Sequence, residues 1–260
     1  MAVVILGMHR SGTSVLTRTI SLLGADLPRN LYGAGVGNET GHWEPARILE
    51  LNDWLLAAIG SSTADPLELP AGWSDSPAAR EFLPRMIELL ADEYGESELF
   101  VLKDPRLCRL LALWLEAFSA AGVEPRFVLA VRNPLEAARS LHARSPVVPL
   151  ADGLRMWLSH CSATERDTRG HPRSVVLYDE LLRDWRSVVG RIAAELDLTW
   201  PLLGDHRAEA EISRFMRPGR PRETVSIDEL QAAEEVSEEV VAQFLSLRRQ
   251  AVSEPKESAR

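Results

Sequence analysis

Two glycines with a basic and hydroxyl-rich stretch stand near the start of the chain. The sequence Gly-Met-His-Arg-Ser-Gly-Thr-Ser occupies residues 7–14 and has the Gly-x4-Gly spacing of a loop that wraps an anion. Glycines let the backbone turn around such an anion, and amide groups at the start of a following helix point toward it. We therefore expect residues 7–14, here called the glycine loop, to bind a phosphate or a similar anion. A tight strand-to-helix turn without a ligand is the alternative.

The glycine loop differs at one position from the loops of proteins that hydrolyse nucleoside triphosphates. Those loops carry a lysine after the second glycine, whereas this chain has Thr13 there and has its cation, Arg10, three residues earlier. Because that lysine reaches the β- and γ-phosphates, its absence argues against phosphoryl transfer from ATP. A kinase that uses Mg-ATP remains an alternative, since the apolar run before Asp179 and Glu180 resembles the acidic strand end of such enzymes.

A second candidate for anion binding lies in the middle of the chain. Arg132 closes an apolar stretch, and Ser140 follows eight residues later, on a helix that Pro134 is suited to begin. A guanidinium can hold a phosphate through a forked pair of hydrogen bonds, and a nearby hydroxyl adds a further donor. The competing interpretation is that Arg132 pairs with a surface carboxylate.

Lysine occurs only twice in the chain, although Lys and Arg together number 29. Lys256 lies near the C-terminus, whereas Lys103 follows an apolar stretch and precedes Asp104 and Pro105. A lysine at a strand end is ordinarily exposed and without a role. In a chain that otherwise uses arginine, however, this lysine stands out, because a compact ammonium can follow a small transferring group where a planar guanidinium cannot.

Together, the glycine loop and the Arg132–Ser140 pair resemble the donor signature of PAPS-dependent sulfotransferases, in the form known from bacterial, carbohydrate and tyrosylprotein enzymes. These enzymes transfer a sulfuryl group from 3′-phosphoadenosine 5′-phosphosulfate (PAPS) to a hydroxyl. Two motifs in the correct relative position are more specific than either alone. The resemblance implies PAPS as the donor substrate, with no metal required. The donor-binding residues that it implies are His9, Arg10, Ser11, Gly12, Thr13, Ser14, Arg132, Ser140 and Tyr178.

The resemblance also implies catalytic roles. Arg10 and Lys103 would stabilise the charge on the transferring sulfonate, because Lys-Asp-Pro resembles a segment of tyrosylprotein sulfotransferases. For the base that takes the acceptor's proton, Glu44 is the first candidate and His42 the second. Related bacterial enzymes carry Gly-aromatic-aromatic-Glu where this chain has Gly-His-Trp-Glu at residues 41–44. Glu44 as a mere helix-start carboxylate is the alternative.

These residues require a scaffold that brings several strand ends together. Apolar stretches predict strands at residues 2–6, 99–102, 126–131 and 174–178. Apolar residues at helical spacing predict helices at residues 15–23, 46–59, 76–93, 107–118, from 134, 150–161, 181–196 and 238–249, with a capping box at Ser226 and Glu229. Strands that alternate with helices indicate a parallel sheet. The glycine-rich residues 25–41 predict a long mobile loop.

The expected fold is α/β: a single-domain, P-loop nucleotide-kinase-like three-layer fold, with a central, mainly parallel sheet flanked by helices. We expect residues 1–250 to form the sulfotransferase domain and residues 251–260 to be a disordered tail.

The composition limits the class of protein. A formal net charge of −9 argues against a general nucleic-acid binder or a binder of anionic membranes. The first apolar run is too short for a signal sequence or a membrane span. Cys108 and Cys161 lie far apart without metal-like spacing, which indicates neither a disulfide scaffold nor a zinc site. We expect a soluble, cytoplasmic protein without an integral membrane segment; the sequence carries no indication of its oligomeric state.

Three functions remain at this point. The first is transfer of a sulfuryl group to a hydroxyl of a small-molecule, carbohydrate or lipid acceptor, with release of 3′,5′-adenosine bisphosphate (PAP). The others are a kinase that uses Mg-ATP and a non-catalytic nucleotide-binding protein. We expect residues 31–75 and 142–160 to form the acceptor site, with the loop residues Trp43 and Trp73 lining it. The arginines of residues 214–222 would cap the 3′-phosphate, contact an anionic acceptor, or simply be solvated.

Four other tryptophans occupy apolar positions of the predicted helices, and we expect them in the core. They are Trp54, Trp114, Trp157 and Trp185.

Overall fold

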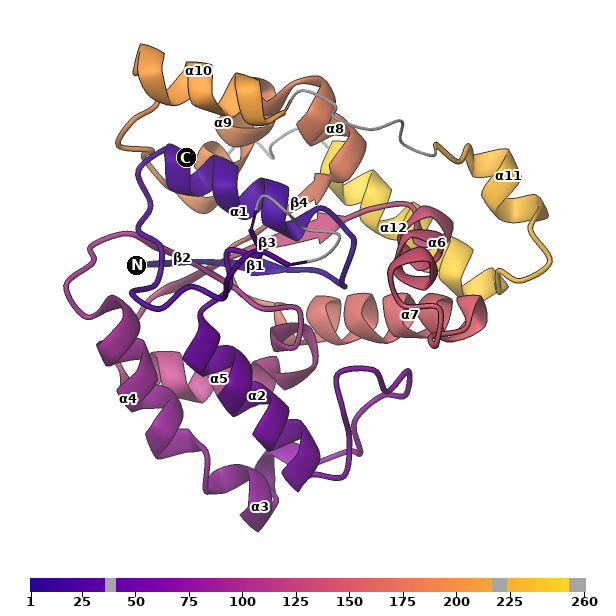
Figure 1. Cartoon of the computed structure of the whole chain (residues 1–260), viewed down its shortest axis with the longest axis horizontal. Helices are drawn as coiled ribbons and strands as arrows, with labels where there is room; N and C mark the ends of the chain where they lie inside the picture. Colours follow the sequence, from indigo (N-terminus) through magenta and orange to yellow (C-terminus); the bar gives the residue numbers. More distant parts are fainter. Residues whose placement is uncertain (36–40, 217–223, 253–260) are drawn as a thin grey trace.

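A single sheet of four parallel strands organises the molecule. The computed structural model describes residues 1–35, 41–216 and 224–252. The strands are β1 (Ala2–Leu6), β2 (Phe100–Lys103), β3 (Pro125–Val131) and β4 (Arg173–Leu177), in the order β2-β1-β3-β4 (Figure 1). Each lies within one residue of its predicted range. At the end of β4, Tyr178 belongs to the following helix and not to the strand.

Helices connect and cover these strands. They are α1 (Thr13–Leu22), α2 (Ala46–Ala58), a 3-10 turn η1 (Trp73–Asp75), α3 (Pro77–Arg80), α4 (Leu83–Tyr94), α5 (Leu107–Ala120), α6 (Pro134–Arg144), α7 (Leu150–Asp167), α8 (Tyr178–Arg183), α9 (Trp185–Leu196), α10 (His206–Phe215), α11 (Ile227–Ala232) and α12 (Glu238–Val252). Among the residues that the structure describes, no helix combines the length and the apolar character needed to cross a membrane.

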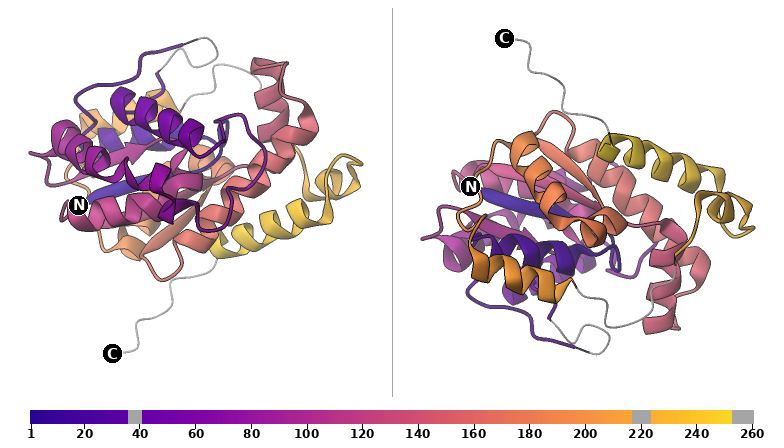
Figure 2. Two further views of the ribbon diagram at one scale, coloured as in Figure 1. Left: turned by 90° about the horizontal axis from the view of Figure 1, so that it is seen from below. Right: turned by 90° about the horizontal axis from the view of Figure 1, so that it is seen from above.

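Both faces of the sheet are covered, which gives the predicted three-layer α/β fold. Successive side chains of a strand point to opposite faces. Val3 and Ile5 of β1 therefore pack with apolar residues of α1, α9 and α10, while Val4 and Leu6 pack with those of α4, α5, α7 and α12. The two helical layers lie on opposite sides of the strands in Figures 1 and 2. All strands are buried, as their continuous apolar sequences predict.

The predicted helix at residues 76–93 is interrupted. The chain forms α3, capped by the Ser76 hydroxyl, and then begins again as α4 with Pro84 in its first turn. Proline lacks an amide hydrogen and its ring clashes with the carbonyl four residues earlier, so a continuous helix is excluded here. Trp54 was expected in the core, and that expectation is wrong, because 63% of this residue is exposed. The other three helical tryptophans are buried.

In the second half of the chain, the observed helices differ from the predicted ones at two places, and one predicted helix start is confirmed. Asp184 divides the predicted helix at residues 181–196 into α8 and α9, because its carboxylate caps α9 by accepting from the Ser187 amide. Helix α10 was not predicted, although Asp205 caps it in the same way. The predicted capping box is confirmed, with the Ser226 side chain accepting from the main chain of Glu229. Most of the predicted tail, from residue 253 on, lies outside the described residues.

The strand order determines where a ligand can bind. From β1 the chain moves to β2 at one edge and then returns to β3 on the other side of β1. In open α/β sheets, such a switch in direction leaves a crevice at the carboxyl ends of the strands, where ligands bind. The residues that follow the four strands are Gly7, Asp104, Arg132 and Tyr178, and they gather at this one edge.

Candidate active site at the carboxyl edge of the sheet

The glycine loop joins β1 to α1 at the switch point. Its backbone is left-handed at two positions, Arg10 (φ 70°) and Gly12 (φ 87°). The amide of Gly7 donates to the Cys108 sulfur at 3.0 Å, which attaches the start of the loop to α5. Gly12 is the N-cap of α1, and no acidic side chain lies in the first turn of this helix. The first amides of α1 therefore point into the loop with the positive end of the helix dipole behind them.

Tyr178 packs directly on the glycine loop. A Cβ atom built on Gly12 would lie 2.2 Å from the Tyr178 ring, so a side chain at this position would force the ring to move. The Arg132 guanidinium carbon lies 5.1 Å from the centre of the same ring. A cation at this distance is attracted by the face of the ring. Tyr178 therefore fills the space between the loop and the arginine that follows β3.

Arg10, Arg132 and Ser140 are linked beside the loop. Arg10 Nε donates to Ser140 Oγ at 3.0 Å, and Arg132 Nη1 donates to the main-chain oxygen of Arg10 at 3.3 Å. The arginine and the serine that were predicted to bind one phosphate are thus joined through Arg10. Arg132 also forms an ion pair with Glu136 at 2.8 Å, so it has a carboxylate partner, as the competing interpretation expected.

Glu136 is a site residue that the sequence interpretation missed. It follows Arg132 by four residues, and its other oxygen accepts from the Val225 amide at 2.9 Å. A glutamate four residues from an arginine at a helix start is a common ion-pair spacing, so the signal was present in the sequence.

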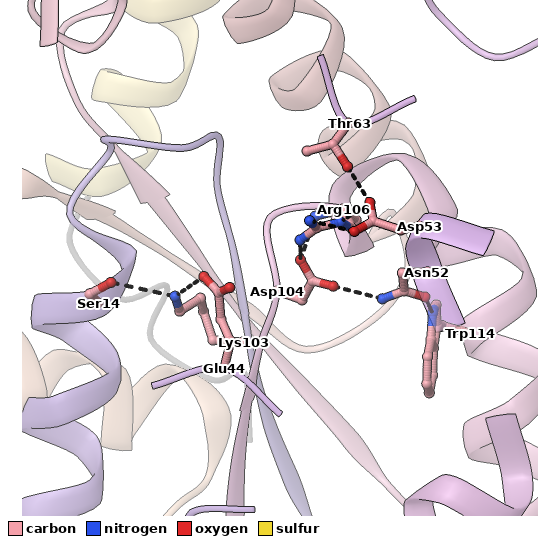
Figure 3. Close-up of polar contacts among 9 residues, drawn as sticks. All are labelled: Ser14, Glu44, Asn52, Asp53, Thr63, Lys103, Asp104, Arg106 and Trp114. Carbon is pink, nitrogen blue, oxygen red and sulfur yellow. Dashed lines mark hydrogen bonds and ion pairs between the residues drawn. The ribbon is translucent and has the colours of Figure 1, made fainter. Parts of the chain in front are cut away.

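The second cluster of the site contains the only lysine outside the C-terminal tail. Lys103 Nζ donates to Glu44 Oε1 at 2.5 Å and to Ser14 Oγ of α1 at 3.4 Å (Figure 3). The Lys103 side chain is 1% exposed and the Glu44 side chain 8%. The interpretation of Lys103 as an exposed lysine is therefore wrong, and Glu44, which precedes α2, has this lysine as a buried partner. One predicted cation and one predicted base form a buried ion pair next to the glycine loop.

Burial dominates the electrostatics of this ion pair. Removal from water lowers the pKa of Lys103 below its ordinary value, and the negative charge of Glu44 opposes that shift. Removal from water likewise raises the pKa of Glu44, and here the Lys103 ammonium opposes the shift. Each group is thus favoured in its charged form chiefly by its partner. Any change that separates the two groups alters the protonation of both.

His42 lies on the same side of the site. Its main-chain oxygen accepts from Ser14 Oγ at 3.3 Å, and its ring packs edge-on against Tyr32. Burial, together with the positive charges of Lys103, Arg144 and Arg10, lowers the pKa of His42 to about 4. His42 is therefore a neutral imidazole near pH 7. Of the two predicted bases, only Glu44 makes direct contact with Lys103 in the structure.

Two polar atoms of the glycine loop are buried without a hydrogen-bond partner among the described residues. They are His9 Nε2 and Ser11 Oγ. Buried polar groups are nearly always paired, so an unpaired group at a ligand loop indicates a place for a ligand or water atom. Together with the left-handed backbone and the absence of a Cβ at Gly12, these atoms fit a loop that receives an anion. Thr13, which is buried, occupies the first position of α1.

Two cavities are relevant to ligand binding, and the smaller of them borders this edge of the sheet. One of about 140 Å³ is lined by Arg132, Tyr178 and Arg248, among other residues. The larger one, of about 380 Å³, lies between the loop at residues 68–74 and helices α5 and α7; Trp73 and Ser159 contribute to its wall. Both segments that were predicted to form the acceptor site therefore reach the larger cavity. Trp43 lies elsewhere, under the guanidinium of Arg18.

The remaining predictions concern the arginines of residues 214–222, metals and the Asp179–Glu180 segment. Of the arginines in residues 214–222, only Arg214 belongs to the described residues, in α10. In the described part of the chain, no group of three or more His, Cys, Asp or Glu side chains is arranged to hold a metal ion. Asp179 and Glu180 lie in the first turn of α8, where they form ion pairs with Arg183 and Arg191.

Comparison with known proteins supports the fold. No protein-family model matches the chain, and no curated protein sequence matches it. Among solved structures, the sulfotransferase domain from the Synechococcus PCC 7002 olefin synthase superposes with a TM-score of 0.50 at 16% identity, covering 94% of each chain. The sulfotransferase domain from the curacin biosynthetic pathway superposes with a TM-score of 0.43 at 14% sequence identity, and the match covers 94% of this chain and 96% of that one. Retinol dehydratase, solved with androsterone and inactive cofactor PAP, gives 0.39 at 16%, covering 94% and 69%. The likeness to the olefin synthase domain shows that the chain has the fold of a sulfotransferase domain.

A first prediction concerns the contact of Gly12 with Tyr178. Gly12→Ala is expected to destabilise the protein by more than the roughly 1–2 kcal/mol that a left-handed alanine costs, because its methyl group meets the ring. Gly122→Ala is the matched control, since Gly122 also has a positive φ (65°) but no described atom within 4 Å of its built Cβ. Urea unfolding of both variants, and of Gly12→Ala combined with Tyr178→Ala, measures how much more free energy of unfolding Gly12→Ala loses than Gly122→Ala. Equal losses for Gly12→Ala and Gly122→Ala would contradict the packing.

A second prediction concerns the acid sensitivity that His42 confers. The pKa of His42 in the folded protein is about 4 and the ordinary value is 6.5, so the unfolded chain binds the additional proton between these pH values. The free energy of unfolding therefore falls as the pH falls through this range. Wild type is expected to lose more stability than His42→Asn between pH 6.5 and 4 in chemical unfolding. Parallel curves for the two proteins would refute this, and His206→Asn controls for the loss of an exposed imidazole.

Proposed function

We propose that this protein is a PAPS-dependent sulfotransferase that transfers a sulfuryl group to a hydroxyl acceptor and releases PAP. The observation that carries the proposal is the buried contact of Lys103 with both Glu44 and Ser14 at the start of α1. It brings a cation, a carboxylate and an anion-binding loop to one edge of the sheet. The sulfotransferase-domain fold supports the same function.

The donor would bind along the switch point of the sheet. The amides of the glycine loop and Arg10 are suited to the 5′-phosphosulfate, since a helix N-terminus and a left-handed turn together favour an anion. Arg132 and Ser140 are suited to the 3′-phosphate. Arg132 would then exchange Glu136 for the phosphate, since a guanidinium fork pairs with either anion through two parallel hydrogen bonds. The unpaired Ser11 hydroxyl offers an additional donor.

The chain supplies two chemical functions for the transfer. The Lys103 ammonium would stabilise negative charge on the transferring sulfonate and on the oxygen that it leaves. The Glu44 carboxylate would take the proton of the acceptor hydroxyl as its oxygen bonds to sulfur. Burial raises the pKa of Glu44, and this makes the carboxylate a better base. In this proposal the transfer requires no metal.

The cavity of about 380 Å³ is our candidate for the acceptor site. It has the size of a small-molecule pocket, and its wall combines apolar side chains, such as Leu69, Trp73 and Ala163, with charged and polar ones. Ser159 and Arg109 supply polar groups. His160 does not line this cavity; it follows the lining residue Ser159 on α7, and its ring lies 6.4 Å from that of His9 in the glycine loop. Such a pocket suits a hydroxyl-bearing molecule with an apolar body.

Binding of PAP is the third prediction. At a concentration of about 100 Kd, PAP is expected to stabilise the protein by about 2.7 kcal/mol, seen as a rise in Tm that Mg-ATP and AMP do not match. Arg132→Ala is expected to remove most of that rise. Arg155→Ala, which changes an exposed arginine of α7, is the control that retains it. A larger rise with Mg-ATP than with PAP would favour the kinase alternative and contradict our proposal.

The fourth prediction separates binding from chemistry. Lys103→Met and Glu44→Gln are each expected to lower kcat by about 100-fold or more while the Tm rise with PAP persists, because they remove charge that acts on the reacting atoms. Release of PAP from PAPS in the presence of acceptor measures turnover. If both variants turned over at the wild-type rate, neither residue would belong to the mechanism. If PAP bound but neither the wild-type protein nor the variants converted PAPS, the non-catalytic alternative would be favoured.

A further inference from the structure

Asp104, the residue after Lys103, is a carboxylate with no exposed surface. Both of its oxygens are occupied. Oδ1 accepts from the Arg106 amide at 3.1 Å and from Arg106 Nη1 at 2.8 Å, and Oδ2 accepts from Asn52 Nδ2 at 2.8 Å. A carboxylate buried so completely is expensive unless every lone pair has a donor, so these contacts constrain its position strongly.

Asn52 connects this carboxylate to two helices. It lies on α2, is fully buried, and accepts from Trp114 Nε1 of α5 at 2.9 Å through its Oδ1. Its amide therefore has a fixed orientation, with the donor side toward Asp104 and the acceptor side toward Trp114 (Figure 3). Trp114 is buried in the core, as expected, and Asn52 is the polar partner of its indole nitrogen there.

Further polar contacts, from Arg106, Asp53 and Thr63, surround the Asp104–Asn52 contact. Arg106 forms a forked ion pair with Asp53, with Nε to Oδ1 at 2.7 Å and Nη2 to Oδ2 at 2.9 Å. Thr63 Oγ1 also donates to Asp53 Oδ1. Burial opposes the charge of Arg106, yet the Asp104 and Asp53 carboxylates raise its pKa well above the usual value. The Asp53 side chain is 41% exposed, so this outer pair borders solvent.

The same two chain segments that meet at Asn52 and Asp104 also meet at the reactive pair. Glu44 lies two residues before α2, and Asn52 lies on α2 about 9 Å along the helix axis from its first residue. Lys103 and Asp104 are adjacent in the chain. The contacts Lys103–Glu44 and Asp104–Asn52 therefore cross-link the end of β2 at two points to the segment that runs from Glu44 to the middle of α2. The Lys103–Glu44 contact joins the two groups with proposed catalytic roles, and the Asp104–Asn52 contact fixes the distance between the two chain segments that hold them.

We infer that Asp104 and Asn52 are positioning residues that hold the Lys103 ammonium against the Glu44 carboxylate. The catalytic role of the ion pair that they hold rests on the proposed function. Neither residue touches the reacting groups directly in this account; each acts through the chain segment that it fixes. Loss of the Asn52 contact allows α2 and Glu44 to shift relative to β2 and Lys103.

The chain offers a direct test because it contains only two lysines, Lys103 and Lys256. Protein labelled with 15N at lysine Nζ and 13C at Cε gives NMR signals from these two side chains alone, and the Lys103 signal reports its own pKa. Glu44→Gln is expected to lower that pKa, because the carboxylate raises it. Asn52→Leu changes no charge, so a shift in the same direction means that one of the two carboxylates that raise this pKa, Glu44 or Asp104, has moved away from Lys103.

The expected results separate positioning from a merely structural role. Asn52→Leu is expected to lower the pKa of Lys103 and to lower kcat by about 100-fold with an unchanged Tm rise on PAP binding, since a misplacement of about 1 Å costs this much. Asp53→Asn is the control: it breaks the outer pair with Arg106 and is expected to leave the Lys103 pKa as in wild type. A folded Asn52→Leu protein with the wild-type Lys103 titration would overturn the inference.

A milder variant serves if Asn52→Leu does not fold. Trp114→Phe keeps the aromatic packing but removes the hydrogen bond that orients Asn52. It is expected to lower the pKa of Lys103 by a smaller amount, and an unchanged titration would overturn the inference. The lysine titration requires no enzymatic turnover. Failure of the proposed function is seen separately, as a wild-type protein without a Tm rise in PAP.

Discussion

The buried contact of Lys103 with Glu44 is the interaction on which the rest of the site depends. Taking an ammonium and a carboxylate out of water costs several kcal/mol per ion, and their attraction repays that cost only in a favourable geometry. The fold supplies the geometry from three directions. Ser14 approaches from α1, Glu44 precedes α2, and the Asp104–Asn52 contact fixes the end of β2 to α2. A pair held so closely is sensitive to any charge that enters beside it, as a transferring sulfonate would.

The strand order explains why the remaining cations lie nearby in an acidic protein. A net charge of −9 gives no general attraction for a polyanionic donor. Because β1 lies between β2 and β3, however, the residues that follow these strands converge on one edge. Arg10, Lys103 and Arg132 each come from a loop or strand end of this edge, so the local charge of the crevice is set by topology rather than by composition. Tyr178, after β4, fills the space between two of them.

Much of this arrangement could be predicted from the sequence. Continuous apolar runs identify the four strands, and the glycine spacing identifies the loop, because both are local signals. The rest depends on tertiary contacts. Nothing local to Lys103 identifies Glu44 as its partner, since the two are 59 residues apart. The Asp104–Asn52 contact, 52 residues apart, is likewise invisible. Two misses were avoidable: Pro84 interrupts a helix by its own chemistry, and Glu136 stands at an ion-pair spacing from Arg132.

Transfer of labelled sulfate tests the central claim most directly. PAPS with 35S in the sulfonate is incubated with the protein and a panel of hydroxyl-bearing small molecules, carbohydrates, lipids and cell extracts, and the products are separated. Our account predicts that label moves from PAPS to an organic acceptor with stoichiometric release of PAP, in wild type but not in Lys103→Met. If no acceptor were labelled, while [γ-32P]ATP and Mg2+ in the same panel gave a phosphorylated product, the account would be contradicted.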